Sequence, residues 1–173
     1  AAAEGANMEI VQAAVLLHDL DSSRANHHLG AGLFAQQVLD EEGWAKEKID
    51  AVIHCIKAHR FRDNTNQPET LEAKVLFDAD KLDAIGATGV GRAIGYAVSH
   101  QQPVYAEPSR QFILTGQLEE GEPHSAYHEY LFKLRHLKER IYTGTGKAMA
   151  EERHRFMQAF FERLQEEGGN TEL

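Results

Sequence analysis

A histidine and an aspartate stand side by side at residues 18 and 19, at the end of the strongly apolar stretch MEIVQAAVLLHDL. Polar side chains in such a setting need hydrogen-bond partners or ligands, because burying them unpaired costs free energy. His18 and Asp19 are therefore candidates for metal binding. The alternative is a buried histidine that is hydrogen-bonded to a carbonyl group at the end of its helix.

Further residues of the metal-binding type follow within apolar patterns. His27 and His28 come shortly after the pair, and His59 continues the apolar line of its own helix. The sequence DADKLDA at residues 78–84 places carboxylates inside another hydrophobic helix. The chain has ten histidines in 173 residues, a high count that points toward metal or acid-base chemistry.

Imidazole nitrogen and carboxylate oxygen together suit a divalent cation such as manganese, magnesium, iron, cobalt, nickel or zinc, and the mixture does not choose among them. Such an ion lowers the pKa of bound water and neutralises phosphoryl oxygens, which is what the hydrolysis of a phosphate ester or anhydride requires. The candidate ligands thus favour a metal-dependent phosphohydrolase.

The elements that must position these side chains are predicted to be helices. Apolar residues recur at helical spacing along most of the chain, and we find no alternating strand pattern. The expected fold class is therefore all-α. Segment 101–123 carries three of the four prolines, which predicts a long loop. The predicted helices cover about residues 4–20, 28–40, 47–60, 70–85, 92–100, 125–142 and 147–166.

Length and composition bound the class of protein. A chain of 173 residues predicts one domain, with a metal-binding helical core over residues 1–100 and a loop with C-terminal helices packing on it over residues 101–173. No apolar run is long enough to span a bilayer and no secretion signal is visible, so we expect a cytoplasmic protein. The formal charge of -9 argues against a nucleic-acid polymer as partner and leaves small anionic substrates open.

The single cysteine, Cys55, excludes an internal disulfide and a thiolate metal cluster. We expect it to be a small buried apolar residue.

The carboxylates of the fourth predicted helix leave two ligand candidates. Asp78 falls on one stripe with apolar residues of that helix, whereas Asp80 lies opposite. A helix that is buried on several faces would accommodate either residue as the ligand. Asp78 could instead orient a ligand histidine through a hydrogen bond.

The ordered motifs resemble those of the HD superfamily of metal-dependent phosphohydrolases. They are LLHDLD, HHLGAG, IKAHRF and TLEAKVLFDADKLDAIGATGVGRA. Together with KLRHLKERIYTGTGKAMAEERHRFMQAFFERL they look most like the bacterial pyrophosphohydrolase-like subgroup, and the likeness covers nearly the whole chain. The resemblance implies an HD-domain helical bundle with a C-terminal helical extension.

The resemblance also implies roles for individual residues. In the family an upstream histidine, the His-Asp pair and a later aspartate hold one metal ion, which carries the ligand set onto His18, Asp19 and Asp80. The upstream histidine has no counterpart in this sequence, and residues 1–7, AAAEGAN, look like the end of the helix that would carry it.

Substrate and a second ion have further candidates. His28 and His59 resemble positions that hold a second ion in some members and face substrate phosphates in others. The resemblance also suggests that Asp21 orients the attacking water, and the alternative for Asp21 is a solvated carboxylate at the end of its helix. Lys81 and Arg92 adjoin the site motifs in sequence and could neutralise phosphate charge.

The function we expect is hydrolysis of a nucleotide or related phosphate, with release of pyrophosphate from nucleoside triphosphates as the reaction that the subgroup likeness implies. The alternatives are a non-catalytic nucleotide-binding HD module and a di-iron oxygenase. A homodimer is left open.

Overall fold

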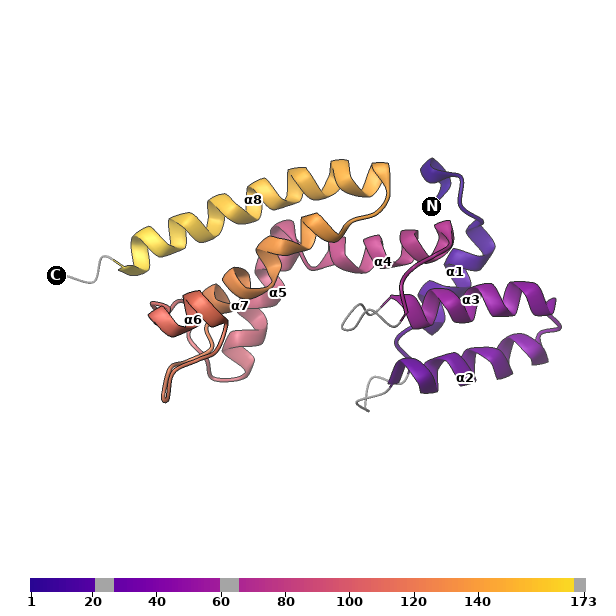
Figure 1. Cartoon of the computed structure of the whole chain (residues 1–173), viewed down its shortest axis with the longest axis horizontal. Coiled ribbons are helices and arrows are strands. Elements are labelled where there is room, and N and C mark those ends of the chain that lie inside the picture. The colour runs from indigo at the N-terminus through magenta and orange to yellow at the C-terminus, as the bar shows by residue number, and fades with distance from the viewer. Residues whose placement is uncertain (21–26, 60–65, 170–173) are drawn as a thin grey trace. The chain divides into compact units, whose positions relative to one another are not determined.

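The computed structural model describes residues 1–20, 27–59 and 66–169 of the chain. Within these ranges the regular structure is helical, without strands, so the predicted all-α class is confirmed (Figure 1). None of the helices in this part of the chain has both the length and the apolar character needed to cross a bilayer. The chain divides into two compact units, Ala1–Asp80 with Tyr142–Gly146 and Lys81–Ile141 with Lys147–Leu173. The predicted single domain, with a metal-binding core over residues 1–100 and an extension over residues 101–173, stays a prediction.

The first unit is built around α3, on which both α1 and α2 pack, and α2 and α3 run side by side (Figure 1). Its core consists mainly of small and branched apolar side chains contributed by all of its α-helices. The elements of this unit are η1 (Ala2–Glu4), α1 (Met8–Leu17), α2 (His27–Glu41), α3 (Lys46–Ala58) and the part of α4 (Leu71–Asp83) that ends at Asp80.

Helix α1 begins four residues later than predicted. Gly5, with a φ of 75°, ends the short η1 helix, and the side chain of Asn7 then accepts hydrogen bonds from the backbone N–H groups of Glu9 at 3.1 Å and Ile10 at 3.4 Å. Asparagine is a favoured N-cap residue because it satisfies N–H groups that have no partner inside the helix. The cap therefore sets the start of α1 at Met8.

Helix α3 follows its predicted pattern closely. Ile49, Val52 and Ile56 are buried as the spacing predicts, and Cys55 is fully buried among them. Burial raises the pKa of the Cys55 thiol to about 12, since the thiolate would lose its hydration. The expectation of a buried, apolar-type cysteine is confirmed.

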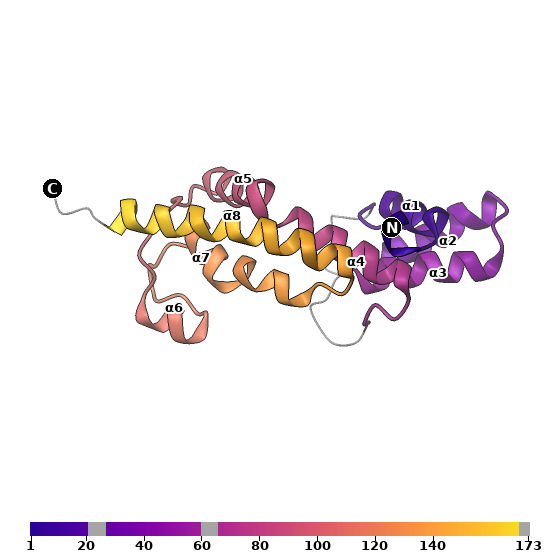
Figure 2. The same ribbon diagram turned by 90° about the horizontal axis from the view of Figure 1, so that it is seen from above.

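The core of the second unit combines aliphatic side chains with stacked aromatic rings. Phe161 is fully buried and stacks on Tyr130, with ring centroids 4.4 Å apart and an interplanar angle of 12°. Helix α8 runs beside α7 and η2 in both views (Figures 1 and 2). The elements of this unit are the end of α4, α5 (Gly86–Ser99), α6 (Arg110–Thr115), α7 (Ala126–Phe132), η2 (Leu134–Arg140) and most of α8 (Gly144–Gly169).

Helix α5 begins at Gly86, six residues before the predicted start, because its glycines permit close packing rather than interrupt the helix. Gly86 has a φ of 73°, and a Cβ atom on it would lie 2.9 Å from the Cβ of Arg153. A Cβ atom on Gly89 would lie only 2.2 Å from the carbonyl oxygen of Ala84. These two glycines let α5 start immediately after α4.

The predicted loop at residues 101–123 contains a short helix, α6. The hydroxyl of Ser109 accepts a hydrogen bond from the N–H of Phe112 at the start of α6, and Gly116, with a φ of 72°, ends it. A serine cap and a terminal glycine are typical helix boundaries, but six residues are too few to show apolar periodicity. The prediction of a long loop was wrong at this point.

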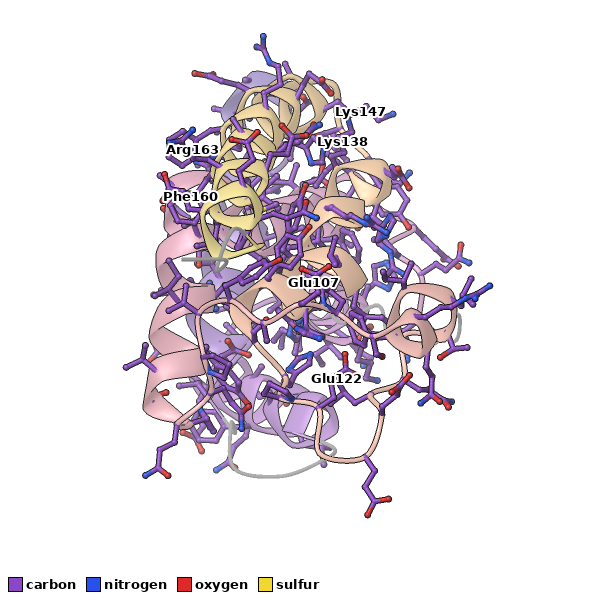
Figure 3. All side chains as sticks on the ribbon, turned by 90° about the vertical axis from the view of Figure 1, so that its left-hand side faces the viewer. Glu107, Glu122, Lys138, Lys147, Phe160 and Arg163 are labelled. Carbon is purple, nitrogen blue, oxygen red and sulfur yellow. The ribbon has the colours of Figure 1, made fainter. Side chains whose placement is uncertain are left out.

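Glu122, labelled in Figure 3, has a side chain that is only 7% exposed and fastens this segment to the start of α7. It accepts hydrogen bonds from the N–H of Ser109 at 2.6 Å, the Ser109 hydroxyl and the Glu119 N–H at 2.7 Å each, and Nε2 of His128 at 3.0 Å. Burial acts to raise the pKa of Glu122, but these hydrogen bonds outweigh it and lower the pKa to about 2. The segment is therefore anchored although it lacks long helices.

The predicted helix at residues 125–142 is divided in two. The backbone departs from α-helical geometry at Lys133, with φ of −128° and ψ of −56°, and continues as the 3-10 helix η2. Helix α8 starts at Gly144, three residues before its predicted start, and the hydroxyl of Thr143 accepts a hydrogen bond from the N–H of Gly146 at that end.

Candidate metal centre

The His18-Asp19 pair lies where α1 ends. His18 follows the last helical residue, Leu17, and still has helical dihedral angles, with φ of −69° and ψ of −30°. The side chain of His18 is mostly buried, whereas that of Asp19 is 58% exposed. The pair thus joins a nitrogen donor that is fixed by packing to a carboxylate that solvent reaches.

A second histidine reaches the pair from α3. His59 follows the last residue of α3, and only 2% of it is exposed. The rings of His18 and His59 meet edge to face, with centroids 5.0 Å apart and an interplanar angle of 84°. Residues 41 positions apart in sequence therefore form one side-chain group at the ends of two packed helices.

The backbone fixes the same tautomer for both histidines. Nδ1 of His18 lies 2.8 Å from the carbonyl oxygen of Val15, and Nδ1 of His59 lies 2.5 Å from that of Ile56. A carbonyl oxygen only accepts, so each Nδ1 carries the proton and each neutral ring keeps a lone pair on Nε2. A hydrogen bond that orients the ring while the other nitrogen faces the ion is the usual arrangement of histidine ligands.

Both Nε2 atoms face the Asp19 carboxylate. Nε2 of His18 is 3.4 Å from Oδ2, and Nε2 of His59 is 3.8 Å from Oδ1. One donor atom from each of the three residues lies within 4.8 Å of the other two. Ligands about 2.1 Å from a tetrahedral ion lie about 3.4 Å apart, so this spacing and the chemistry of the donors fit a divalent metal ion.

The environment of His59 favours its neutral form. Burial lowers its pKa below the ordinary histidine value, the hydrogen bond to Ile56 opposes that effect, and the neighbouring His18 adds to it. The negative charges of Asp80 and Asp19 also act to raise the pKa, but the net shift is downward. A neutral imidazole is the form that binds metals, so the site favours the ligand state.

The two aspartates of α4 face different partners. Both oxygens of Asp78, which is 2% exposed, accept hydrogen bonds from Tyr142 and Thr143. Asp80 is near enough to His59 for its charge to influence that ring. The predicted ligand set of His18, Asp19 and Asp80 stays a prediction, and the structure places His59 beside the first two.

Two predicted site residues cannot be placed. Asp21 lies outside the described residues. His28 is in the first turn of α2, and its side chain lies outside the described part of the chain. Their roles as water-orienting and substrate-binding residues stay predictions.

The two predicted phosphate-binding cations belong to the second unit. Lys81 lies in the last turn of α4, and Arg92 lies on α5, where its guanidinium pairs with the carboxylate of Asp83. Both Arg92 and Asp83 are largely exposed. A substrate role for Lys81 and Arg92 stays a prediction.

Comparison with known proteins places this geometry in a family. The HD domain family matches residues 1–85. Over 170 residues the chain is 35% identical to the uncharacterized protein YpgQ of Bacillus subtilis, an alignment that covers 95% of this chain and 75% of YpgQ. The chain belongs to the HD family. The predicted superfamily is thereby confirmed, and the pyrophosphohydrolase-like subgroup stays a prediction.

Solved structures agree with the HD assignment along most of the chain. The crystal structure of B. subtilis YpgQ in complex with ADP matches with a TM-score of 0.72 and 32% identity, covering 96% of this chain and 80% of YpgQ. An HD-superfamily hydrolase from Bacillus thuringiensis matches with a TM-score of 0.73 and 26% identity, covering 98% and 79% of the respective chains. Family membership and these neighbours support metal-dependent phosphohydrolase chemistry in general terms.

Proposed function

We propose that this HD protein hydrolyses a phosphate ester or anhydride of a nucleotide at one divalent ion held by His18, Asp19 and His59, with Asp80 as a further ligand. The observation that carries the proposal is the convergence of two imidazole Nε2 atoms and one carboxylate within 4.8 Å. Their Nδ1 hydrogen bonds leave both Nε2 lone pairs available for a metal.

The charge of the donor set suits an anionic substrate. Two neutral imidazoles and the carboxylates of Asp19 and Asp80 together contribute two negative charges, so a divalent ion among them leaves no excess negative charge that would repel phosphate. When bound, such an ion polarises a phosphoryl oxygen and lowers the pKa of bound water. Asp19 is the most exposed of the three residues and is therefore the one that an incoming substrate approaches.

A nucleotide is the substrate class we favour, because the related YpgQ was crystallised with ADP. Release of pyrophosphate from nucleoside triphosphates is our specific proposal for the reaction. In it, Asp21 orients the attacking water, and His28, Lys81 and Arg92 contact the phosphates.

The test is a hydrolysis assay with nucleoside triphosphates and phosphate monoesters, each with manganese, magnesium, cobalt, nickel, zinc or iron(II), in which phosphate and pyrophosphate are measured separately. Asp19→Ala should abolish turnover. Asp50→Ala is the matched control, because Asp50 is a carboxylate of similar exposure, 60%, that pairs with Lys46 on the surface of α3.

Three outcomes would contradict the proposal. Equal activity in Asp19→Ala and the wild type would place the chemistry elsewhere. Nucleotide binding without turnover under any of these ions would favour the non-catalytic module, and two redox-active irons per chain would favour the oxygenase.

A further inference from the structure

The buried carboxylate of Asp78 binds a segment that is distant in sequence. Its Oδ1 accepts a hydrogen bond from the N–H of Tyr142 at 2.9 Å, and its Oδ2 accepts from the N–H of Thr143 at 2.8 Å and from the Thr143 hydroxyl at 2.6 Å. Hydrogen bonds to a carboxylate are stronger than hydrogen bonds between two uncharged groups, and Asp78 accepts three of them. They tie α4 to the stretch of chain at residues 142–146.

This stretch is itself fixed within the first unit. The ring of Tyr142 meets that of Phe77 edge to face, with centroids 5.2 Å apart. The carboxylate of Glu4 accepts a hydrogen bond from the N–H of Thr145 at 2.5 Å, and hydrogen bonds from Thr145 lower the pKa of Glu4. Asp78 therefore binds an anchored partner.

We call the three hydrogen bonds of Asp78 to Tyr142 and Thr143 the tether. Because Asp78 and Asp80 lie on the same helix, the tether also determines the direction in which Asp80 points. Side chains two residues apart on an α-helix point about 200° apart around its axis. While Asp78 faces residues 142–143, Asp80 must point to nearly the opposite side of α4. Leu76 lies one turn before Asp80 on the same face of α4 and belongs to the same buried cluster as residues of α1 and α3, the helices that end next to His18 and His59. A rotation of α4 that broke the tether would therefore also turn Asp80 away from His59.

We propose that Asp78 is a positioning residue of the metal centre: its hydrogen bonds to Tyr142 and Thr143 fix the rotation of α4, so that Asp80 faces the group formed by His18, Asp19 and His59. This inference rests on the proposed function, in which Asp80 is a metal ligand. Asp78 itself does not bind the ion, because its oxygens are taken by the tether.

The test uses Co²⁺ as a probe, because its visible absorption reports the ligand geometry independently of turnover. Thr143→Val removes the hydroxyl that donates to Asp78 and should weaken Co²⁺ binding by about 10-fold, the lower end of the effect of residues that orient metal ligands. It should also change the visible spectrum. Thr143→Ser keeps the hydroxyl and should restore both the affinity and the spectrum.

The matched control is Thr70→Val. The hydroxyl of Thr70 accepts a hydrogen bond from the N–H of Ala73 at the other end of α4, so the same substitution destabilises the same helix without touching the tether. Melting temperatures of both valine variants are measured together with their Co²⁺ binding. The proposal predicts that Thr70→Val keeps the affinity and spectrum of the wild type.

Two results would overturn the positioning role, namely wild-type affinity and spectrum in Thr143→Val, or equal losses in Thr70→Val and Thr143→Val. Asp19→Ala separates this failure from that of the proposed function. If Asp19→Ala still binds Co²⁺ as the wild type does, the metal centre itself is wrong. If Asp19→Ala loses Co²⁺ binding while Thr143→Val keeps it, only the positioning role of Asp78 is wrong.

Discussion

Replacing His59 by glutamine removes one imidazole from the candidate metal centre and keeps a polar side chain of similar length at a site that is 2% exposed. The substitution takes away the Nε2 atom that lies 3.8 Å from Asp19 and the hydrogen bond from Nδ1 to the carbonyl of Ile56. We expect metal affinity to fall far more than stability.

The magnitudes follow from these two losses. Residues that merely orient a metal ligand change affinity by about 10–100-fold, so losing a ligand should cost at least about 100-fold, which corresponds to about 2.8 kcal/mol of binding free energy. The lost hydrogen bond should lower the free energy of unfolding by only about 1 kcal/mol.

Isothermal titration with Mn²⁺ at pH 7.5 measures the effect. His54→Gln is the control, because His54 lies on the same helix and its Nε2 accepts a hydrogen bond from the N–H of Glu69 instead of facing the centre. Burial lowers the pKa of His59, so protons compete with the metal at His59 at a lower pH than at an ordinary histidine, and this part of the pH dependence should vanish in His59→Gln. Equal Mn²⁺ affinity in His59→Gln and the wild type would refute the assignment of His59 as a ligand.

Three further outcomes follow from burial and hydrogen bonding. Because burial raises the pKa of Cys55 to about 12, the native thiol should react with a disulfide reagent at pH 8 at least about 100-fold more slowly than the thiol of the unfolded chain, and rapid labelling of native protein would contradict this. Hydrogen bonds lower the pKa of Glu122 to about 2 from an ordinary 4.5, so its stabilisation is present above pH 4.5 and lost as the pH falls toward 2. Glu122→Gln should therefore have a lower melting temperature than the wild type at pH 7, and this difference should shrink as the pH falls. A difference in melting temperature that does not change with pH would contradict the prediction. Phe161→Ala should lower the free energy of unfolding by about 3–5 kcal/mol in denaturant titrations. Phe156→Ala, at a residue that is 51% exposed on the same helix, should lower it by less than about 1 kcal/mol. Similar losses in the two variants would argue against the role of Phe161 in the core.

Local patterns in the sequence were enough to predict much of the fold. The apolar spacing of α3 predicted the burial of Ile49, Val52 and Ile56, and the residue types of His18 and Asp19 singled out the end of α1. The predicted alternative for His18, a hydrogen bond to a helix-end carbonyl, is also present, since Nδ1 binds the Val15 carbonyl. That bond orients the ring and leaves Nε2 for a metal, so the two interpretations are compatible.

Features that depend on distant partners could not be predicted. The stripe on α4 correctly placed Asp78 with buried apolar residues, but nothing local indicated that its partners are Tyr142 and Thr143. His59 was predicted to bind substrate or a second ion, and only the packing of α1 on α3 shows that its Nε2 faces Asp19.

Short elements were missed for a different reason. Helix α6 spans six residues, too few for a period of 3.6 to be visible, and its boundaries depend on a serine hydroxyl and a terminal glycine. Helix α7 gives way to η2 at Lys133, where the backbone leaves α-helical geometry. Lysine is a good helix former, so nothing in the sequence indicated a break at this position.

In the proposed metal centre, His18, Asp19 and His59 hold one divalent ion. The most direct test of this centre is an anomalous difference map, measured near the manganese absorption edge, from crystals of the protein soaked in Mn²⁺. We predict one strong peak within coordination distance of Nε2 of both histidines and of a carboxylate oxygen of Asp19. A peak bound elsewhere, with these three side chains turned away from it, would contradict the proposal.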